Sequence, residues 1–252
     1  MEHTGKHALV TGGGTGIGKS IALALAEAGA AVTITGRRGE VLETAAQAHG
    51  NLHPLVMDVA DESSVTEGIT AAVAEHGPIQ ICVANAGIAE GGAFADTTLA
   101  QWRKTMAINL DGVFLTVQGA LASLPPEMPG RIIVVSSIAG VRGLKGAIPY
   151  TVSKHGIIGL IRGLSEEYIG RPVTFNALCP GYVYTAIVQN QVPGLMRRKA
   201  VDEAGALAAI AKGNRHHQLL EVDETTAAAM WLCSDGARSV NGQTVEIAGG
   251  QV

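Results

Sequence analysis

Short apolar segments alternate with longer helix-like segments over residues 1–180, and this alternation is the feature that most restricts the fold. Strand–helix–strand repeats predict parallel βαβ units. Strands that are apolar throughout are typical of a sheet with helices on both faces. The expected strands are Ala8–Thr11, Ala31–Thr35, Leu52–Met57, Ile79–Ala84, Arg131–Ser136, Val173–Leu178 and Gln243–Ile247. The expected helices are Ile17–Ala28, Glu40–Ala48, Ser63–His76, Leu99–Leu121, Tyr150–Tyr168 and Glu224–Leu232.

The chain reads as one α/β domain over residues 1–252, because no Pro- or Ser-rich linker divides it. Residues 185–217 break the alternation, and we expect them to form a helical flap over a pocket. The net charge of -4 and the lack of a basic stripe argue against nucleic-acid binding. No run approaches 18 consecutive apolar residues and the start leaves no room for a signal peptide, so we expect a cytoplasmic protein without a membrane span.

Cysteine and histidine patterns do not indicate a metal site. The three cysteines form no C-x-x-C pair, so neither a disulfide framework nor a zinc knuckle is expected. His49 and His53 are four residues apart, and His216 and His217 are adjacent, but neither pair has Cys or carboxylate partners at ligand spacing. We therefore expect surface histidines and no bound metal.

A glycine-rich turn follows the first expected strand, in the sequence Thr11-Gly12-Gly13-Gly14-Thr15-Gly16-Ile17-Gly18. Glycines let the backbone approach a phosphate, and the following helix offers free N–H groups. The segment from Gly13 to Gly18-Lys19-Ser20 also matches a P-loop, for which Asp58 could be the magnesium partner. The turn by itself leaves a dinucleotide enzyme and a nucleotide hydrolase both open.

The end of the second strand indicates which dinucleotide would bind. An acidic residue at this point holds a ribose 2′-hydroxyl, whereas an arginine suits a 2′-phosphate. The sequence has Gly36 where the acid is expected, followed by Arg37 and Arg38. NADP(H) is therefore favoured over NAD(H), which stays an alternative.

Tyr150 and Lys154 are four residues apart in an expected helix, so their side chains share one face. Ser137 follows the preceding strand, and a strand end and this helix face would converge on one pocket. Reduction of a ketone needs a proton donor, and a nearby ammonium is expected to lower the pKa of a phenol. A serine hydroxyl can stabilise the substrate oxygen. No G-x-S-x-G motif supports a serine hydrolase.

Taken jointly, these motifs resemble the short-chain dehydrogenase/reductase family over essentially the full length of the chain. The matching residues are Thr11, Gly12, Gly16, Gly18, Asn85-Ala86-Gly87, Asn109, Ser137, Tyr150, Lys154, Pro180-Gly181 and Thr185. The resemblance implies a single-domain Rossmann fold, a doubly wound seven-stranded parallel sheet with helices on both faces. It also implies a homotetramer or homodimer, whose contacts the helices Leu99–Leu121 and Tyr150–Tyr168 would carry. The sequence departs from the family at Ala84, where an asparagine is common, and at Thr15, where NADP-dependent members often have a basic residue.

The resemblance also implies a role for each matching residue. Tyr150 would be the acid/base, Lys154 would bind the nicotinamide ribose, Ser137 would orient the substrate, and Asn109 would hold a water in a proton relay. The implied cofactor-binding residues are Thr11, Gly12, Thr15, Gly16, Ile17, Gly18, Arg37, Arg38, Asp58, Val59, Asn85, Ala86, Gly87, Tyr150, Lys154, Pro180, Gly181, Val183 and Thr185.

The expected reaction is NAD(P)(H)-dependent interconversion of a ketone and a secondary alcohol. Ser137, Val141, Leu144 and Tyr182 are expected to contact a hydrophobic substrate. Alternatively, the basic cluster 197–199 (Arg-Arg-Lys) would contact the phosphates of a carrier, making the chain a 3-oxoacyl-thioester (CoA or ACP) reductase or 3-hydroxyacyl dehydrogenase. A non-catalytic nucleotide sensor and a P-loop NTPase also remain, although a sensor has no need for the four groups of Asn109, Ser137, Tyr150 and Lys154.

Overall fold

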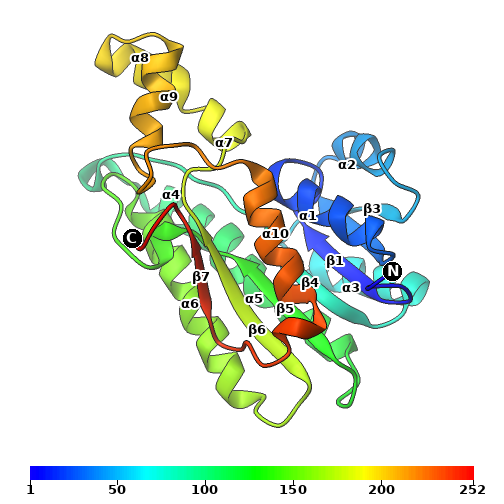
Figure 1. The fold of residues 1–252 in the computed structure, drawn as a ribbon. Helices are drawn as coiled ribbons and strands as arrows, with labels where there is room; N and C mark the ends of the chain where they lie inside the picture. Colours follow the sequence, from blue (N-terminus) through cyan, green and yellow to red (C-terminus); the bar gives the residue numbers. More distant parts are fainter.

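Seven parallel strands form a single sheet in the order β3-β2-β1-β4-β5-β6-β7. We describe residues 1–252 from a computed structural model (Figure 1). The strands are β1 (His7–Thr11), β2 (Ala31–Gly36), β3 (Leu52–Val56), β4 (Ile79–Ala84), β5 (Gly130–Val135), β6 (Val173–Pro180) and β7 (Thr244–Ile247). The predicted seven-stranded parallel sheet is confirmed, and each predicted strand is found with small shifts at its ends.

Helices cover both faces of the sheet, as predicted. They are α1 (Gly16–Glu27), α2 (Gly39–Ala46), α3 (Glu62–His76), α4 (Leu99–Met106), α5 (Gly112–Ser123), α6 (Ile148–Glu167), α7 (Ala186–Gln189), α8 (Val192–Lys199), α9 (Glu203–Ala211) and α10 (Val222–Cys233). Buried side chains of α1, α2 and α10 pack on one face, and those of α3, α5 and α6 pack on the other. Helices α1 and α10 lie side by side (Figure 1).

Strand position in the sheet explains the burial pattern of each strand. All five residues of β1 and all eight of β6 are buried, because these strands lie inside the sheet with helices above and below. Strand β3 alternates between less and more exposed residues, because it lies at the edge of the sheet. The strand order reverses between β1 and β4, and such a reversal opens a crevice at the carboxyl ends of the strands.

The expected helix Leu99–Leu121 is a continuous helical run with a π-helical turn inside it. Helix α4 continues into the turn η2 (Ala107–Asp111) and then into α5. The run Leu99–Ser123 is long and apolar enough to cross a membrane by length and composition alone, with a mean hydropathy of 1.2. In the fold its buried residues, among them Val113 and Val117, pack on the sheet, so it is a core helix. The expected cytoplasmic location stays a prediction.

Residues 186–211 form three short helices beyond the carboxyl end of the sheet. Helices α7, α8 and α9 project from the body of the molecule (Figure 1). They have a small apolar cluster of their own, made of Val188, Val192, Ala206 and Ile210. The segment for which a helical flap was predicted is thus helical and stands next to the carboxyl ends of the strands.

Candidate active site

The glycine-rich turn between β1 and α1 has a backbone that only glycine accommodates at several points. Gly12 and Gly16 have φ angles of 66° and 54°, in the left-handed region. A Cβ atom at Gly18 would lie 2.4 Å from Asn85 Nδ2 and 2.5 Å from the carbonyl oxygen of Gly12. The turn is therefore packed closely against the end of β4, with the first residues of α1 directly behind it.

Two side chains that a P-loop would use have hydrogen-bond partners within the fold. The Ser20 hydroxyl accepts a hydrogen bond of 2.8 Å from Thr226 on α10. The carboxylate of Asp58, the candidate magnesium partner, accepts a hydrogen bond of 3.0 Å from the backbone N–H of Ala60. The structure therefore favours the dinucleotide interpretation of the turn over the P-loop interpretation.

Thr11 and Asn85 join the ends of β1 and β4. The Thr11 hydroxyl accepts hydrogen bonds from the backbone N–H groups of Asn85 (3.0 Å) and Ala86 (3.1 Å). Asn85 Nδ2 donates in return to the carbonyl oxygens of Thr11 (3.0 Å) and Gly12 (3.3 Å). One asparagine is thus sufficient to hold the turn, so Ala84 in place of a second one leaves no gap in this network.

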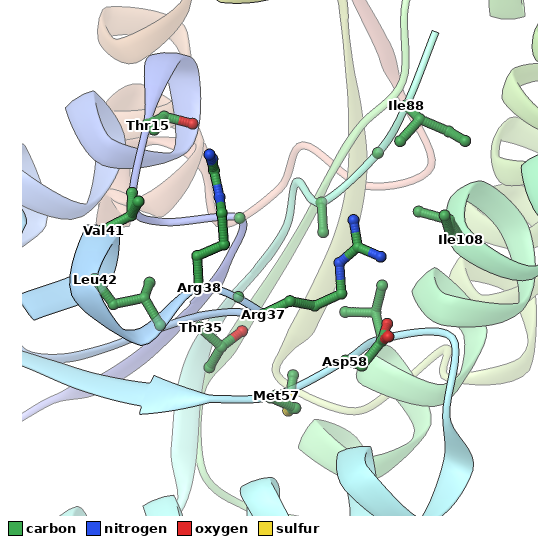
Figure 2. A pocket seen from close by; sticks show the side chains of 16 residues that line it. Thr15, Thr35, Arg37, Arg38, Val41, Leu42, Met57, Asp58, Ile88 and Ile108 are labelled. Carbon is green, nitrogen blue, oxygen red and sulfur yellow. The ribbon is translucent and has the colours of Figure 1, made fainter. Parts of the chain in front are cut away.

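A cleft opens at the carboxyl ends of β1, β2 and β3 (Figure 2). Arg38 extends toward Thr15, and Arg37 extends toward Ile88 in the same cleft (Figure 2). Neither guanidinium forms an ion pair with a carboxylate. Gly36 ends β2, so no acidic side chain occupies that position. The cleft fits a group with an anionic phosphate.

A larger cavity of about 1020 Å³ adjoins this cleft, and Gly87 and Ile88 line both. Together the two form a continuous groove along the carboxyl edge of the sheet. Of the predicted cofactor residues, the cleft is lined by Gly12, Thr15, Arg37, Arg38, Asp58, Val59, Ala86 and Gly87. The cavity is lined by Ile17, Asn85, Gly87, Tyr150, Lys154, Pro180, Gly181, Val183 and Thr185. Thr11, Gly16 and Gly18 line neither, because they lie within or behind the turn.

Ser137 and Tyr150 both line the cavity. Burial raises the pKa of the Tyr150 phenol, and the neighbouring Ser137 hydroxyl lowers that pKa in part. Ser137 itself is held at the end of β5, because its hydroxyl accepts a hydrogen bond of 3.1 Å from the N–H of Ala139. The pair therefore presents a protonated phenol and a fixed hydroxyl to the same space.

Lys154 lies on the same face of α6 as Tyr150, as the spacing predicted. Its ammonium is 5.6 Å from the centre of the Tyr150 ring and donates a hydrogen bond of 2.8 Å to the carbonyl oxygen of Val135. Burial lowers the pKa of Lys154 to about 8. The expected lowering of the Tyr150 pKa by Lys154 is not found, because the ammonium is directed at the Val135 carbonyl and burial of the phenol has the larger effect.

Asn109 is fully buried in the π-helical turn and lines neither space. Its Oδ1 accepts from the N–H of Ile88 (2.8 Å), and its Nδ2 donates to the carbonyl oxygen of Ile88 (2.9 Å) and to the hydroxyl of Ser153 (3.2 Å). A Cβ atom at Gly87 would lie 3.3 Å from Asn109 Oδ1 and 3.6 Å from Lys154 Nζ. The Asn109 side chain therefore fixes the segment that borders Lys154.

Three residues with positioning roles were missed by sequence reasoning. Ser153 donates to the backbone carbonyl of Tyr150 (2.8 Å) and accepts from Asn109. Asn214 accepts from the N–H of Tyr182 (2.8 Å) and donates to its carbonyl oxygen (3.0 Å). Arg142 donates to the carbonyl oxygen of Gly213 (2.9 Å). Ser153 could have been found as a polar residue on the buried face of α6. No local sequence pattern marks Arg142 or Asn214 as a positioning residue.

The predicted substrate contacts are found in the cavity with one exception. Ser137, Leu144 and Tyr182 line it. Val141 does not, because its side chain packs against the buried cluster under α6. Helices α7 and α8 contribute further lining residues, among them Arg198 and Lys199. Arg197, the first residue of the basic cluster, is exposed and does not line the cavity.

A family model described as short chain dehydrogenase matches residues 6–195. The chain belongs to this family. An acetoacetyl-CoA reductase from Rhizobium meliloti (strain 1021) is 32% identical over 244 residues, which cover 97% of this chain and 97% of that protein. The crystal structure of levodione reductase has a TM-score of 0.92 and 31% identity, covering 99% of this chain and 98% of the other.

An actinorhodin polyketide ketoreductase variant, solved with NADPH, is similar as well. Its TM-score is 0.92 at 29% identity, and the match covers 98% of each chain. The comparisons and the fold together define the present protein as an oxidoreductase that acts on CH–OH and C=O groups with a nicotinamide cofactor. This excludes the P-loop NTPase interpretation.

Proposed function

We propose that this protein interconverts a hydrophobic ketone and its secondary alcohol, with NADP(H) as the cofactor. The observation that carries the proposal is the placement of Ser137 and Tyr150 together in one cavity, which Leu144, Tyr182 and Val183 also line. Hydroxyls of this kind bind and protonate a carbonyl oxygen, while apolar side chains around them bind the rest of the substrate.

The roles of the residues follow from their chemistry. The nicotinamide cofactor supplies or accepts the hydride when it is bound. Tyr150 donates its phenolic proton to the substrate oxygen, and Ser137 donates a hydrogen bond to the same oxygen. Because burial raises the pKa of Tyr150, the phenol keeps its proton at neutral pH, which is the state that reduction needs. Lys154 lines the same cavity beside Tyr150, where its ammonium would bind the ribose of the nicotinamide cofactor.

The preference for NADP(H) rests on the cleft at the end of β2. Two arginines without ion-pair partners reach into it, and no carboxylate is present at Gly36 to hold a ribose 2′-hydroxyl. The NADPH in the similar polyketide ketoreductase supports the same choice.

Substitution of Tyr150 by Phe tests the proposed reaction. NADPH oxidation with a hydrophobic ketone, followed by absorbance, should fall by about 100-fold or more, because removal of a general acid costs about 10² to 10⁴ in rate. NADPH binding, followed by fluorescence, should persist. The matched control is Tyr184→Phe, since Tyr184 is 41% exposed and does not line the cavity. Turnover close to wild type in Tyr150→Phe would contradict the proposal.

A carrier-bound 3-oxoacyl thioester is a second candidate substrate, favoured by the placement of Arg198 and Lys199. Both residues line the cavity on the side of α8, where the phosphates of CoA or of a carrier protein's prosthetic arm would be attracted to them. The similarity to an acetoacetyl-CoA reductase supports this candidate as well.

Charge removal on α8 separates the two substrate classes. In Arg198→Gln/Lys199→Gln, KM for acetoacetyl-CoA should rise about tenfold, because one or two charge-assisted hydrogen bonds are lost. Turnover of a free ketone should be unchanged. Arg197→Gln is the matched control, because it removes a neighbouring charge outside the cavity. An equal KM for the thioester in all three proteins would leave only the free ketone.

A further inference from the structure

A second polar cluster lies near the amino ends of the strands, away from the carboxyl ends that form the proposed active site. His53 is on the edge strand β3, and Glu75 and His76 are the last two residues of α3. One ligand atom from each of the three side chains lies within 4.8 Å of the other two. His76 Nε2 and Glu75 Oε1 are 3.5 Å apart. Sequence spacing suggested His49 as the neighbour of His53, but the fold brings His53 to the end of α3 instead.

The position of His76 is fixed by its neighbour His7. The His7 ring contacts the carbonyl oxygen of Gly77 (2.8 Å) and the hydroxyl of Thr33 (2.9 Å), so both of its nitrogens are occupied. Because Gly77 follows His76 directly, this contact holds the end of α3 against β1 and β2. The His76 ring lies between the other two, with its centre 5.3 Å from that of His7 and 4.1 Å from that of His53.

The His76 side chain has an unused ligand atom. Its Nε2 is buried and has no hydrogen-bond partner, and the side chain as a whole is only 12% exposed. The Glu75 carboxylate is 3.5 Å from this atom but forms no hydrogen bond with it, and buried polar atoms nearly always have a hydrogen-bond partner. The Glu75 side chain is 68% exposed and free to turn toward the two imidazoles.

We propose that His53, Glu75 and His76 bind a divalent transition-metal ion of the Zn²⁺ type, with water completing the coordination. Two imidazoles and one carboxylate are a ligand set that suits Zn²⁺. Ligands at about 2.0–2.1 Å in a tetrahedron lie roughly 3.3–3.4 Å from one another. The 3.5 Å between His76 and Glu75 already matches this separation, and the His53 ligand atom needs to approach the other two by at most about 1.4 Å.

The ion would link two elements that are otherwise joined weakly at this edge. Strand β3 pairs only with β2, since it is the last strand on its side of the sheet. A metal ion bound by residues of both β3 and α3 attaches the edge strand to this helix. It makes no contribution to the proposed reaction, which takes place at the carboxyl ends of the strands. Zn²⁺ binding is therefore expected to raise Tm and to leave turnover unchanged.

The test is a titration of the untagged full chain, freed of metal by chelation, with ZnCl2 in a calorimeter. Wild type should bind one equivalent. His53→Gln and His76→Gln should each weaken binding at least tenfold, because a ligand is lost from the metal itself. Glu75→Gln, a change at an exposed position, should weaken binding and abolish the Zn²⁺-dependent rise in Tm without affecting the core.

The matched control is His216→Gln/His217→Gln, which removes the other close histidine pair and should bind Zn²⁺ as wild type does. NADPH binding reports whether each variant is folded. Absence of stoichiometric Zn²⁺ binding by wild type would overturn the proposal. So would binding that survives in Glu75→Gln and His53→Gln but disappears in the control.

Discussion

Lys154, which lines the cavity of the proposed active site, is a buried charged residue with a cost in stability. It is 4% exposed, and burial lowers its pKa from 10.5 to about 8. The folded protein thus carries the charged form against an unfavourable desolvation energy at neutral pH. The difference between the two pKa values corresponds to an upper limit of about 3 kcal/mol. One hydrogen bond, to the carbonyl oxygen of Val135, offsets part of this cost.

Replacement of Lys154 by Met should therefore increase stability while it removes activity. We expect the free energy of unfolding at pH 7 to rise by about 1–2 kcal/mol, after about 1 kcal/mol is subtracted for the lost hydrogen bond. Urea denaturation at pH 7 measures this change.

In wild type, the free energy of unfolding should also rise between pH 8 and pH 10.5, since the unfolded chain binds the Lys154 proton more tightly than the folded chain does in this range. That contribution should be absent in Lys154→Met, and a less stable variant would contradict the interpretation.

Arg37 carries one of the two charges on which the proposed preference for NADP(H) rests. In Arg37→Ala, the dissociation constant for NADPH should rise about 10- to 100-fold, because a charge-assisted hydrogen bond to the 2′-phosphate is worth about 1.5–3 kcal/mol. Fluorescence titration measures it. The constant for NADH, which lacks that phosphate, serves as the internal control and should stay the same. Equal losses for both cofactors would mean that Arg37 does not contact the 2′-phosphate.

At the level of elements, the turn between β1 and α1 was predictable from the sequence. The π-helical turn at Asn109 and the substrate wall were less predictable. The glycines are visible in the sequence because the turn needs positive φ angles and space for Asn85 beside Gly18. The π-helical turn at Asn109 was not predicted, since a π turn depends on side-chain contacts with a distant segment at Ile88. Val141, predicted as part of the substrate wall, packs against the core and does not line the cavity, because an apolar residue after a strand suits a pocket and a core equally well.

The segment after β6 also depends on contacts between distant residues, which local sequence patterns do not predict. Asn214 binds Tyr182 across 32 residues and also donates to the carbonyl oxygen of Gln218 (2.7 Å). Gly181 would place a Cβ atom 2.1 Å from Asn214 Oδ1, so the close approach needs glycine there. The Pro180-Gly181 pair was identified from the family pattern, whereas its partner Asn214 has no local pattern that would mark it.

At the scale of the whole molecule, α5 and α6 each leave a large apolar side chain exposed. Phe114 on α5 is 45% exposed and Val152 on α6 is 41% exposed. Both helices were expected to carry subunit contacts, and burial of these side chains in a homodimer or homotetramer is consistent with that expectation. The oligomeric state stays a prediction.

Phe114→Glu tests that prediction. A buried charge at a subunit contact is unfavourable, so we expect the variant to be a smaller species than wild type in sedimentation velocity. Ile169→Glu is the matched control, because Ile169 is 72% exposed and lies past the end of α6. A wild-type protein that sediments as a monomer would contradict the prediction.

The sequence by itself determined the sheet, the glycine-rich turn and the placement of Tyr150 and Lys154 on one helix face. Each of these depends on local patterns: apolar runs give strands, glycines permit a turn, and helical spacing aligns Tyr150 with Lys154. Tertiary structure alone decided the raised pKa of Tyr150, the hydrogen bond of Lys154 to Val135 and the meeting of His53 with His76. The physical reason is that desolvation and pairing depend on which distant segments pack together, and those contacts exist only once the chain has folded.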